Sequence, residues 1–356
     1  MQIGLVGLPG SGKTTLFNAL VRADADVGGY GGARGPNRGT IQVPDQRISK
    51  LSDLFKPKKT TFATVDYLDI AGITPGSGKQ EDSSDGGLAG LRNMDVLIHV
   101  LQGFESTDQE PPTPGEDFEN IELELAVADL DIVEKRLTRI EKEVRLDRSA
   151  NLAREGELLG ECRVLLEKGE ALRALNLKPE DEKLLRGYQF LTQKPMLVVL
   201  NINEDRIGEE DACLTDLGDL GPEVHPMALC AKVEMEIAQL DEEDAAVFLQ
   251  DLGIDEPALS RMILTSYKML SLISFFTVGE DEVRAWTISI GTLAPGAAGE
   301  IHSDLERGFI RAETVSCSDL LEAGGWSQAR DKGLLRLEGK QYLVQDGDVM
   351  NIRFNV

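Results

Sequence analysis

The 356-residue sequence has no apolar run of about 18 residues, the length that crosses a bilayer as a helix, so we expect no membrane-spanning segment. It opens Met-Gln-Ile-Gly-Leu-Val, with no basic region and no small-residue cleavage site, which predicts no signal peptide. We therefore expect a cytoplasmic protein, whose length corresponds to two or three domains.

Cysteine and histidine are scarce and scattered. The four cysteines are Cys162, Cys213, Cys230 and Cys317, and the three histidines are His99, His225 and His302. The cysteines form no Cys-x-x-Cys pair, which argues against a zinc site and favours free thiols in a reducing compartment. Scattered histidines are typical of structural positions rather than of metal ligands.

Positive charge is also scarce. Lysine and arginine total 37 against 62 acidic residues, which gives a formal net charge of −25. A protein that coats nucleic-acid phosphates has the opposite balance, so we expect no DNA partner and only local contact with any RNA.

A glycine-rich loop lies between a short apolar strand at 2–7 and an amphipathic helix at 13–21. Residues 7–14 read Gly-Leu-Pro-Gly-Ser-Gly-Lys-Thr, which fits the phosphate-binding pattern Gly-x-x-x-x-Gly-Lys-[Ser/Thr]. In this pattern backbone N–H groups and the helix N-terminus bind phosphates, the lysine reaches the β- and γ-phosphates, and the hydroxyl ligates Mg²⁺. The predicted nucleotide-contacting residues of the loop are Gly10, Ser11, Gly12, Lys13, Thr14 and Thr15.

A second short motif, Asp69-Ile-Ala-Gly72, ends the expected strand at 62–70. An aspartate there can hold Mg²⁺ through water, and the N–H of Gly72 can approach the γ-phosphate. We therefore expect Lys13, Asp69 and Gly72 to be catalytic and Thr14 and Asp69 to bind the metal. An ordinary strand-end turn is the alternative interpretation of this motif.

The base-binding residues are expected after another buried strand at 195–200. Guanine-specific switch proteins use Asn-Lys-x-Asp there, but this chain has Asn201, Ile202 and Glu204. The extra methylene of Glu204 displaces the carboxylate that would accept from guanine N1–H and N2–H₂, so guanine selection should weaken. Cys-Ala-Lys at 230–232 resembles the Ser-Ala-Lys loop that closes over the base, which adds Ala231 to the ATP-binding candidates.

The pattern of the chain changes twice. Apolar residues at spacings of three and four, in a seam from Ala126 to Val144 and a second run from Leu159 to Leu172, predict two antiparallel helices within 119–190. The pair would be inserted into an α/β nucleotide-binding domain formed by 1–118 and 191–275. Ordinary helices packed on the sheet are the alternative. Expected strands at 286–290, 342–344 and 349–356 predict a separate α+β domain over 276–356.

With these motifs assembled, the chain resembles the Obg-like ATPase (YchF) family of translation-factor-related P-loop proteins over nearly its whole length. Segments that carry the resemblance include Asp-Ile-Ala-Gly-Ile at 69–73, Asn-x-Asn-Glu-Asp at 201–205 and Asp-Gly-Asp-Val-Met-Asn at 346–351. The resemblance implies an inserted helical hairpin and a C-terminal TGS domain, a ubiquitin-like β-grasp module. It also implies Mg²⁺-dependent binding of ATP in preference to GTP, and association with ribosomes.

The sequence departs from the family pattern at three places. Ala33 replaces the expected Mg²⁺-sensing threonine, the loop 106–116 lacks the family's histidine, and 80–85 is expanded and acidic. Moreover, Ile73 stands where Ras-like GTPases place a water-orienting glutamine. These departures predict slow turnover rather than lost binding.

The leading hypothesis is an ATP-hydrolysing switch that acts on translation, with the large ribosomal subunit as partner. A GTPase switch of the same fold and a nucleotide-gated binding module with negligible turnover remain alternatives. A metabolic kinase is disfavoured because no acceptor pocket with a positioned base is evident. Basic residues proposed for ribosome contact are Lys135, Arg136, Arg139, Lys142 and Arg145 in the helical insertion, and Arg284, Arg307 and Arg311 in the last domain.

Overall fold

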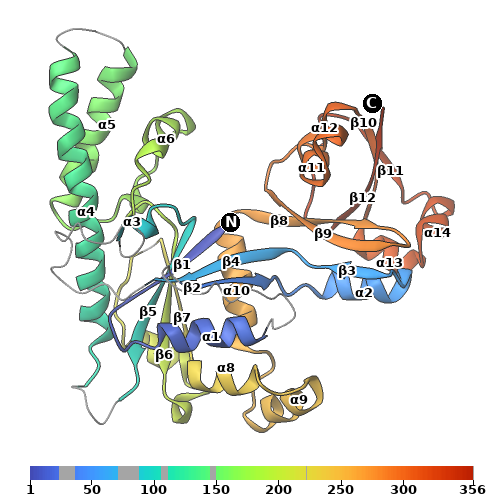
Figure 1. Cartoon of the computed structure of the whole chain (residues 1–356), viewed down its shortest axis with the longest axis horizontal. Helices are drawn as coiled ribbons and strands as arrows, with labels where there is room; N and C mark the ends of the chain where they lie inside the picture. Colours follow the sequence, from blue (N-terminus) through green and yellow to red (C-terminus); the bar gives the residue numbers. More distant parts are fainter. Residues whose placement is uncertain (24–36, 71–87, 106–110, 145–149, 222, 356) are drawn as a thin grey trace. The chain divides into compact units, whose positions relative to one another are not determined.

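The computed structural model describes residues 1–23, 37–70, 88–105, 111–144, 150–221 and 223–355 (Figure 1). Its contacts form two compact units. The first unit comprises 1–41 and 66–259, and the second comprises 42–65 and 260–356. The chain therefore passes between the units after residues 41, 65 and 259.

The first unit contains a six-stranded sheet with the order β2-β4-β1-β5-β6-β7. Its strands are β1 Gln2–Val6, β2 Asn37–Gln42, β4 Thr64–Asp69, β5 Val96–Gly103, β6 Met196–Ile202 and β7 Val224–Leu229. The pairs β4–β1, β1–β5, β5–β6 and β6–β7 are all parallel. The strands expected near 2–7, 62–70, 94–101 and 195–200 are confirmed, and so is the α/β class.

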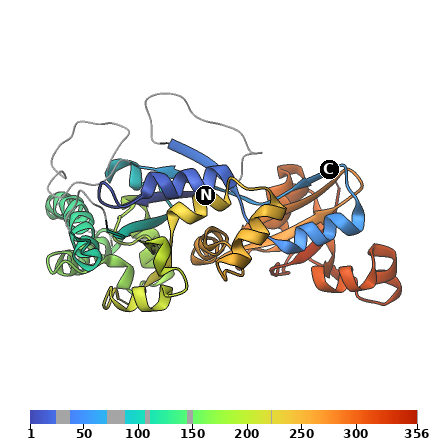
Figure 2. The same ribbon diagram turned by 90° about the horizontal axis from the view of Figure 1, so that it is seen from below.

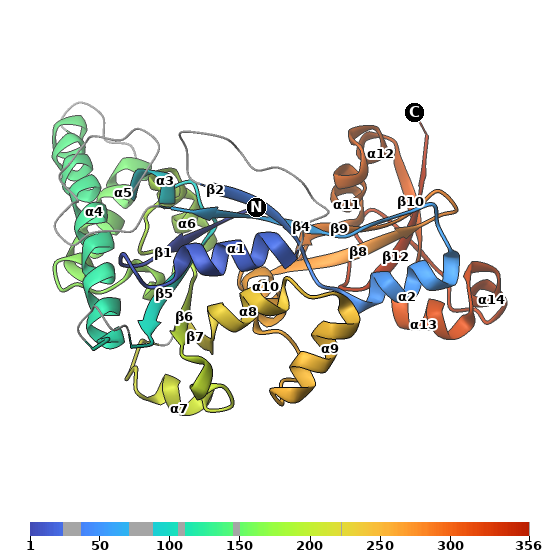
Figure 3. The same cartoon turned by 60° about the horizontal axis from the view of Figure 1, so that its bottom comes forward.

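The helices of the first unit are α1 Lys13–Ala23, α3 Leu88–Leu91, α4 Pro114–Glu143, α5 Ala150–Leu166, α6 Pro179–Leu185, α7 Glu210–Thr215, α8 Ala231–Ile237 and α9 Glu242–Asp251. Every residue from Val96 to Leu101 of β5 is buried. Since successive side chains of a strand point to opposite faces, both faces of the sheet are covered at its centre. Helices α1 and α8 lie side by side (Figure 3), and α4 packs against β5.

Helices α4 and α5 also pack against each other (Figure 1). Their buried residues form a separate core cluster that contains Ala126, Val133 and Ile140 from α4 and Leu159 and Cys162 from α5. The apolar positions from 126 to 140 of the seam predicted over 126–144 therefore lie in the contact between α4 and α5. The seam ends earlier than expected, however.

Val144, the last predicted residue of the seam, is 39% exposed. Gly169, in the second run, lies beyond the end of α5 with φ +77. That backbone conformation favours glycine and stops a helix. Although α4 has 30 residues, no helix among the described residues is long and apolar enough to cross a bilayer.

The second unit has its own six-stranded sheet, with the order β11-β10-β12-β8-β9-β3. Its strands are β3 Lys59–Thr61, β8 Leu272–Val278, β9 Glu282–Ser289, β10 Phe309–Ser316, β11 Arg336–Glu338 and β12 Asp348–Phe354. Strand β12 pairs antiparallel with β10 and parallel with β8, whereas β8 and β9 are antiparallel.

The helices of the second unit are α2 Gln46–Phe55, α11 Ala294–Ile301, α12 Ser303–Arg307, α13 Cys317–Ala323, α14 Trp326–Asp331 and most of α10 Ala258–Met269. Its core joins Phe275, Ile288 and Met350 of the sheet to Ala294 and Ala298 of α11. Helix α11 therefore closes one face of this sheet.

Residues 42–65 belong to the second unit, although the sequence placed them in the nucleotide-binding domain. Strand β3 pairs parallel with β9, and α2 packs on β8 and β9 (Figure 2). The second stretch of this unit begins at residue 260, whereas the sequence placed the start of the last domain at 276. The boundaries differ because these pairings join segments more than 200 positions apart, which periodicity within one segment cannot reveal.

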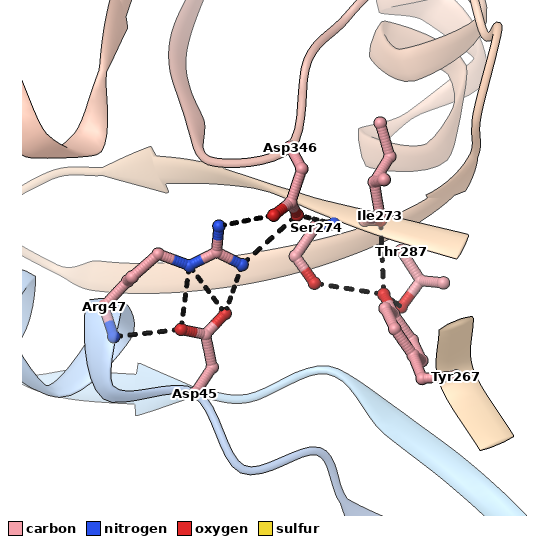
Figure 4. Close-up of polar contacts among 7 residues, drawn as sticks. All are labelled: Asp45, Arg47, Tyr267, Ile273, Ser274, Thr287 and Asp346. Atoms are coloured by element: carbon pink, nitrogen blue, oxygen red, sulfur yellow. Dashed lines mark hydrogen bonds and ion pairs between the residues drawn. The ribbon is translucent and has the colours of Figure 1, made fainter. Parts of the chain in front are cut away.

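Arg47 fixes α2 to the sheet of this unit (Figure 4). Its guanidinium donates to both carboxylate oxygens of Asp45, the N-cap residue of α2, and to both of Asp346. Asp346 also accepts from the backbone N–H of Ser274 at 3.0 Å. One arginine thus joins the start of α2 to β8 and to the turn before β12.

The predicted strand at 342–344 is wrong. Only Leu343 forms an isolated bridge, with Leu293. The neighbouring polar groups converge instead on buried Asp348, which accepts from the Tyr342 hydroxyl at 2.7 Å and from the N–H of Gln345 at 2.9 Å. Gly347, with φ +88, lies in the turn that precedes β12.

Candidate nucleotide-binding site

The glycine loop connects β1 directly to α1. Gly12 has φ +93, and a Cβ there would lie 2.1 Å from Nδ2 of Asn201. A Cβ on Gly7 would lie 2.4 Å from the carbonyl oxygen of Val100. Both positions therefore require glycine, because backbone and a neighbouring amide approach too closely for any side chain. Gly10, with φ +88, lies between them.

Lys13, the first residue of α1, is 7% exposed. Its Nζ donates to the carbonyl oxygens of Gly7 at 3.0 Å and Leu8 at 2.7 Å. Burial lowers the pKa of Lys13, and the charge of Asp69 acts in the opposite direction. The ammonium group is thus held within the loop by two of its three donors.

The two predicted metal-binding side chains are in contact. The Thr14 hydroxyl donates to Oδ2 of Asp69 at 3.0 Å. The contact follows from the parallel pairing of β1 with β4, which sets Leu5 opposite Asp69. A hydroxyl and a carboxylate are hard oxygen donors that suit Mg²⁺, which usually takes few protein ligands and completes its shell with phosphate and water. The donor set therefore fits the expected ion.

Asn201 connects three loops of the site through one amide. Its Nδ2 donates to the carbonyl oxygen of Ser11 at 3.1 Å, and its Oδ1 accepts from the N–H of Ala231 at 2.9 Å. Asn201 is 6% exposed. The structure thus brings together the glycine loop, the end of β6 and the start of α8, which the sequence had assigned separately to phosphate and base.

A cavity of about 480 Å³ adjoins these loops. Its lining residues are Gly12, Thr15, Phe104, Asn201, Ile202, Asn203, Glu204, Asp205, Cys230 and Lys232. Five of the predicted ATP-binding residues are among them, and the other five, which include Phe104 and Cys230, were not predicted. Phe104 comes directly after β5, and position alone, at the carboxyl end of a central strand, was the signal that could have found it.

The charged residues of the cavity include one ion pair. Nζ of Lys232 lies 2.7 Å from Oε2 of Glu204, and this contact raises the pKa of Lys232. The side chain of Ile202 is only 2% exposed, because it packs into the main core while lining the cavity. The position that carries a lysine in guanine-specific proteins therefore presents no charge here.

Several predicted features lie outside the described residues. These are Gly72, Ala33, Ile73, the acidic segment 80–85 and part of the loop 106–116.

The basic residues of the helical insertion that were proposed for ribosome contact have different surroundings. Arg136 donates to Glu155 of α5 at 2.8 Å and to Glu143 at 3.1 Å, so its charge is paired between the helices. Arg145 lies outside the described residues. Lys135, Arg139 and Lys142 are exposed and share one face of α4. We call these three residues the α4 basic stripe.

Two of the three basic residues of the second unit that were proposed for ribosome contact already contact other side chains. Arg284 stacks on the ring of Trp286 at 4.0 Å, and Arg307 pairs with Asp304. Arg311 is exposed.

Comparisons with known proteins agree with this arrangement. A family model described as a 50S ribosome-binding GTPase matches residues 2–140, and the YchF-GTPase C-terminal model, described as a protein of unknown function, matches 272–355. A ribosome-binding ATPase YchF of Bacillus subtilis (strain 168) is 42% identical over 365 residues, which cover 100% of both chains. The chain belongs to the YchF family.

Other YchF proteins support this assignment. The ribosome-binding ATPase YchF of Escherichia coli O157:H7 is 41% identical and covers 100% of this chain and 99% of its own. The solved structure of the Schizosaccharomyces pombe YchF GTPase superposes with a TM-score of 0.86 at 26% identity, covering 99% of this chain and 97% of that one. Two of these relatives are named ATPases and one is named a GTPase, so the choice of nucleotide has to be argued from the residues that line the cavity.

Proposed function

We propose that this chain is an ATP-binding and slowly ATP-hydrolysing molecular switch that associates with ribosomes in the cytoplasm. The phosphate loop, the Thr14–Asp69 contact and membership of the YchF family support a nucleotide hydrolase. The names of the relatives, ribosome-binding ATPases, support a ribosomal partner, and the 50S description of one family model favours the large subunit.

In this proposal Lys13 binds the β- and γ-phosphates while Thr14 and Asp69 hold Mg²⁺. The ion would neutralise charge that develops on the phosphates during hydrolysis. The loop glycines bring backbone N–H groups close to the phosphates, and Thr15 lines the adjoining cavity. The role of Gly72 rests on its sequence position alone.

The preference for adenine rests chiefly on Glu204, which lines the cavity in place of the aspartate of guanine-specific proteins. Buried Ile202 supplies no cation beside it. Asn201 also lines the cavity, and its Oδ1 accepts from the N–H of Ala231, which fixes the start of α8 beside it. Adenine presents an acceptor at N1, where guanine presents a donor, so a displaced carboxylate costs guanine more than adenine.

The domain assignment is part of the same proposal. An Obg-type nucleotide-binding domain would carry α4 and α5 as an inserted antiparallel hairpin. The second unit would be a TGS module of the β-grasp type. The central parallel pair β12–β8 and the packing of helix α11 across one face of the sheet support that module.

The test is a calorimetric titration of the full chain with Mg²⁺ and each of ATP, ADP, GTP and GDP. We expect tighter binding of ADP than of GDP. In Lys13→Ala, the lost charge-assisted contact should weaken ATP binding by about 2–3 kcal/mol, which is roughly 30- to 150-fold. Unchanged ATP affinity in folded Lys13→Ala would refute the phosphate assignment, and tighter GDP binding by wild type would establish the GTPase alternative.

The rate of ATP hydrolysis by the same protein tests the proposal that the switch turns over slowly. Turnover above about 1 s⁻¹, the low end for kinases, would contradict slow hydrolysis. No turnover with or without ribosomes would establish the binding-module alternative. Ribosome-stimulated turnover would instead support a switch whose partner completes the site, as GTPase activators do.

A further inference from the structure

The Lys232–Glu204 ion pair lines the 480 Å³ cavity beside the glycine loop, but it adds little to the stability of the fold. Both side chains are more than half exposed, at 66% and 58%. Such exposed pairs contribute little to stability, because solvent screens them and both side chains lose freedom. The pair therefore does not serve to hold α8 in place.

The pair is nevertheless held in a defined position. The N–H of Ala231, directly before Lys232, is bonded to Oδ1 of Asn201, and Glu204 follows Asn201 by three residues. Both partners thus extend from backbone fixed at the same buried amide. This anchoring places the two side chains within reach of each other, and the ammonium of Lys232 donates to Oε2 of Glu204 at 2.7 Å.

The consequence concerns guanine. A carboxylate recognises guanine by accepting from N1–H with one oxygen and from N2–H₂ with the other. When Lys232 occupies Oε2 of Glu204, one of these oxygens is already engaged. Guanine would then have to displace the ammonium, whereas adenine has no donor at N1 or C2 that needs the carboxylate.

We infer that Lys232 is a specificity-determining residue that disfavours guanine nucleotides by holding the carboxylate of Glu204. This inference rests on the proposed nucleotide site and assigns a role to a residue of the cavity wall. The effect is selective because the lysine leaves the phosphate-binding residues untouched. Its removal should therefore improve guanine binding more than adenine binding.

The experiment compares Lys232→Met with wild type by titrating ADP, GDP and IDP in the presence of Mg²⁺. The ratio of Kd for GDP to Kd for ADP should fall about two- to fivefold, because displacing an exposed ion pair costs no more than that. The gain should be smaller for IDP, because hypoxanthine lacks the N2 amino group. Adding Glu204→Gln to Lys232→Met should abolish the gain.

Lys58→Met is the matched control. Lys58 is also an exposed lysine with a carboxylate partner, Asp281, at 2.7 Å, but it lies in the second unit. The ratio of Kd for GDP to Kd for ADP measured for Lys58→Met should equal that of wild type. An unchanged ratio in a Lys232→Met protein that binds ADP normally would overturn this inference alone. A wild type that binds no nucleotide would instead overturn the proposed function.

Discussion

His99 is a titratable residue buried in the central strand of the nucleotide-binding sheet. It is 0% exposed, its ring stacks on Phe118 at 5.7 Å, and neither ring nitrogen has a partner among the described residues. Burial, with added repulsion from Lys13 and Arg173, lowers the pKa of His99 from 6.5 to about 3. The folded protein therefore keeps this ring neutral at every pH near 7.

This burial predicts a loss of stability in mild acid. Between pH 6.5 and about 3 the unfolded chain binds a proton at residue 99 that the folded chain does not, so falling pH favours unfolding. From pH 7.5 to 5.5, wild type should lose about 1 kcal/mol more unfolding free energy than His99→Leu. Urea unfolding followed by circular dichroism at both pH values would measure the difference, and parallel losses would contradict it.

Much of the site could be predicted at the level of residues. The glycine loop, Asp69 and Asn201 lie in short contiguous motifs, so the spacing of residues within each motif was enough to recognise them. The Glu204–Lys232 pair joins positions 28 apart, and the Asn201–Ser11 bond joins positions 190 apart. Such contacts depend on strand order, which no single motif encodes.

Among the elements, helix α2 is attached to the second unit largely through one side chain, that of Arg47. The α2 segment contains only two buried residues, Ile48 and Leu51, so its apolar contact is small. Its attachment relies on Arg47, whose guanidinium also lies 5.2 Å from the centre of the Phe276 ring. Burial would lower the pKa of Arg47, but its bonds to Asp45 and Asp346 raise it.

Arg47→Ala should therefore destabilise the second unit by about 2 kcal/mol, since it removes charged hydrogen bonds to two carboxylates. Both tryptophans, Trp286 and Trp326, belong to that unit, so urea unfolding followed by tryptophan fluorescence reports on it selectively. Lys58→Met removes an ion pair exposed by 81% and 85% and should cost less than about 1 kcal/mol. Equal effects of the two variants would show that Arg47 is not a special attachment.

The elements that the sequence predicted well are long or fully buried. Strand β6 is buried at all seven positions, and the α4 seam repeats over several turns. By contrast, β3 has three residues and none is buried, so no alternation distinguishes it from a loop. Its position is fixed by β9 and by the bond from the Thr61 hydroxyl to Glu282.

At the scale of the whole molecule, a net charge of −25 conflicts with binding to an RNA-rich particle unless the contact is local. The α4 basic stripe offers such a local patch. Lys135 forms an ion pair with Asp131 at 2.7 Å, and within the described part of the chain neither Arg139 nor Lys142 forms one. In the second unit, Arg284 and Arg307 are already engaged by Trp286 and Asp304.

We therefore predict that reversing the stripe, with Lys135→Glu, Arg139→Glu and Lys142→Glu together, weakens ribosome association more than reversing three bases of the second unit. The matched control carries Arg307→Glu, Arg311→Glu and Lys340→Glu, which changes the net charge equally. Co-sedimentation with ribosomes would be measured over a series of salt concentrations in the ATP- and ADP-bound states. Wild-type binding should decline with salt, because each phosphate contact releases counterions.

The stripe variant should pellet less at low salt and show a shallower salt dependence, while the control should follow wild type. A global effect of added negative charge would weaken both variants alike, so only a difference between them identifies a docking surface. Equal pelleting by wild type and the stripe variant would exclude the stripe. No pelleting of wild type in either nucleotide state would remove the ribosome from the proposed function, while nucleotide binding at the glycine loop would be unaffected because it is measured separately.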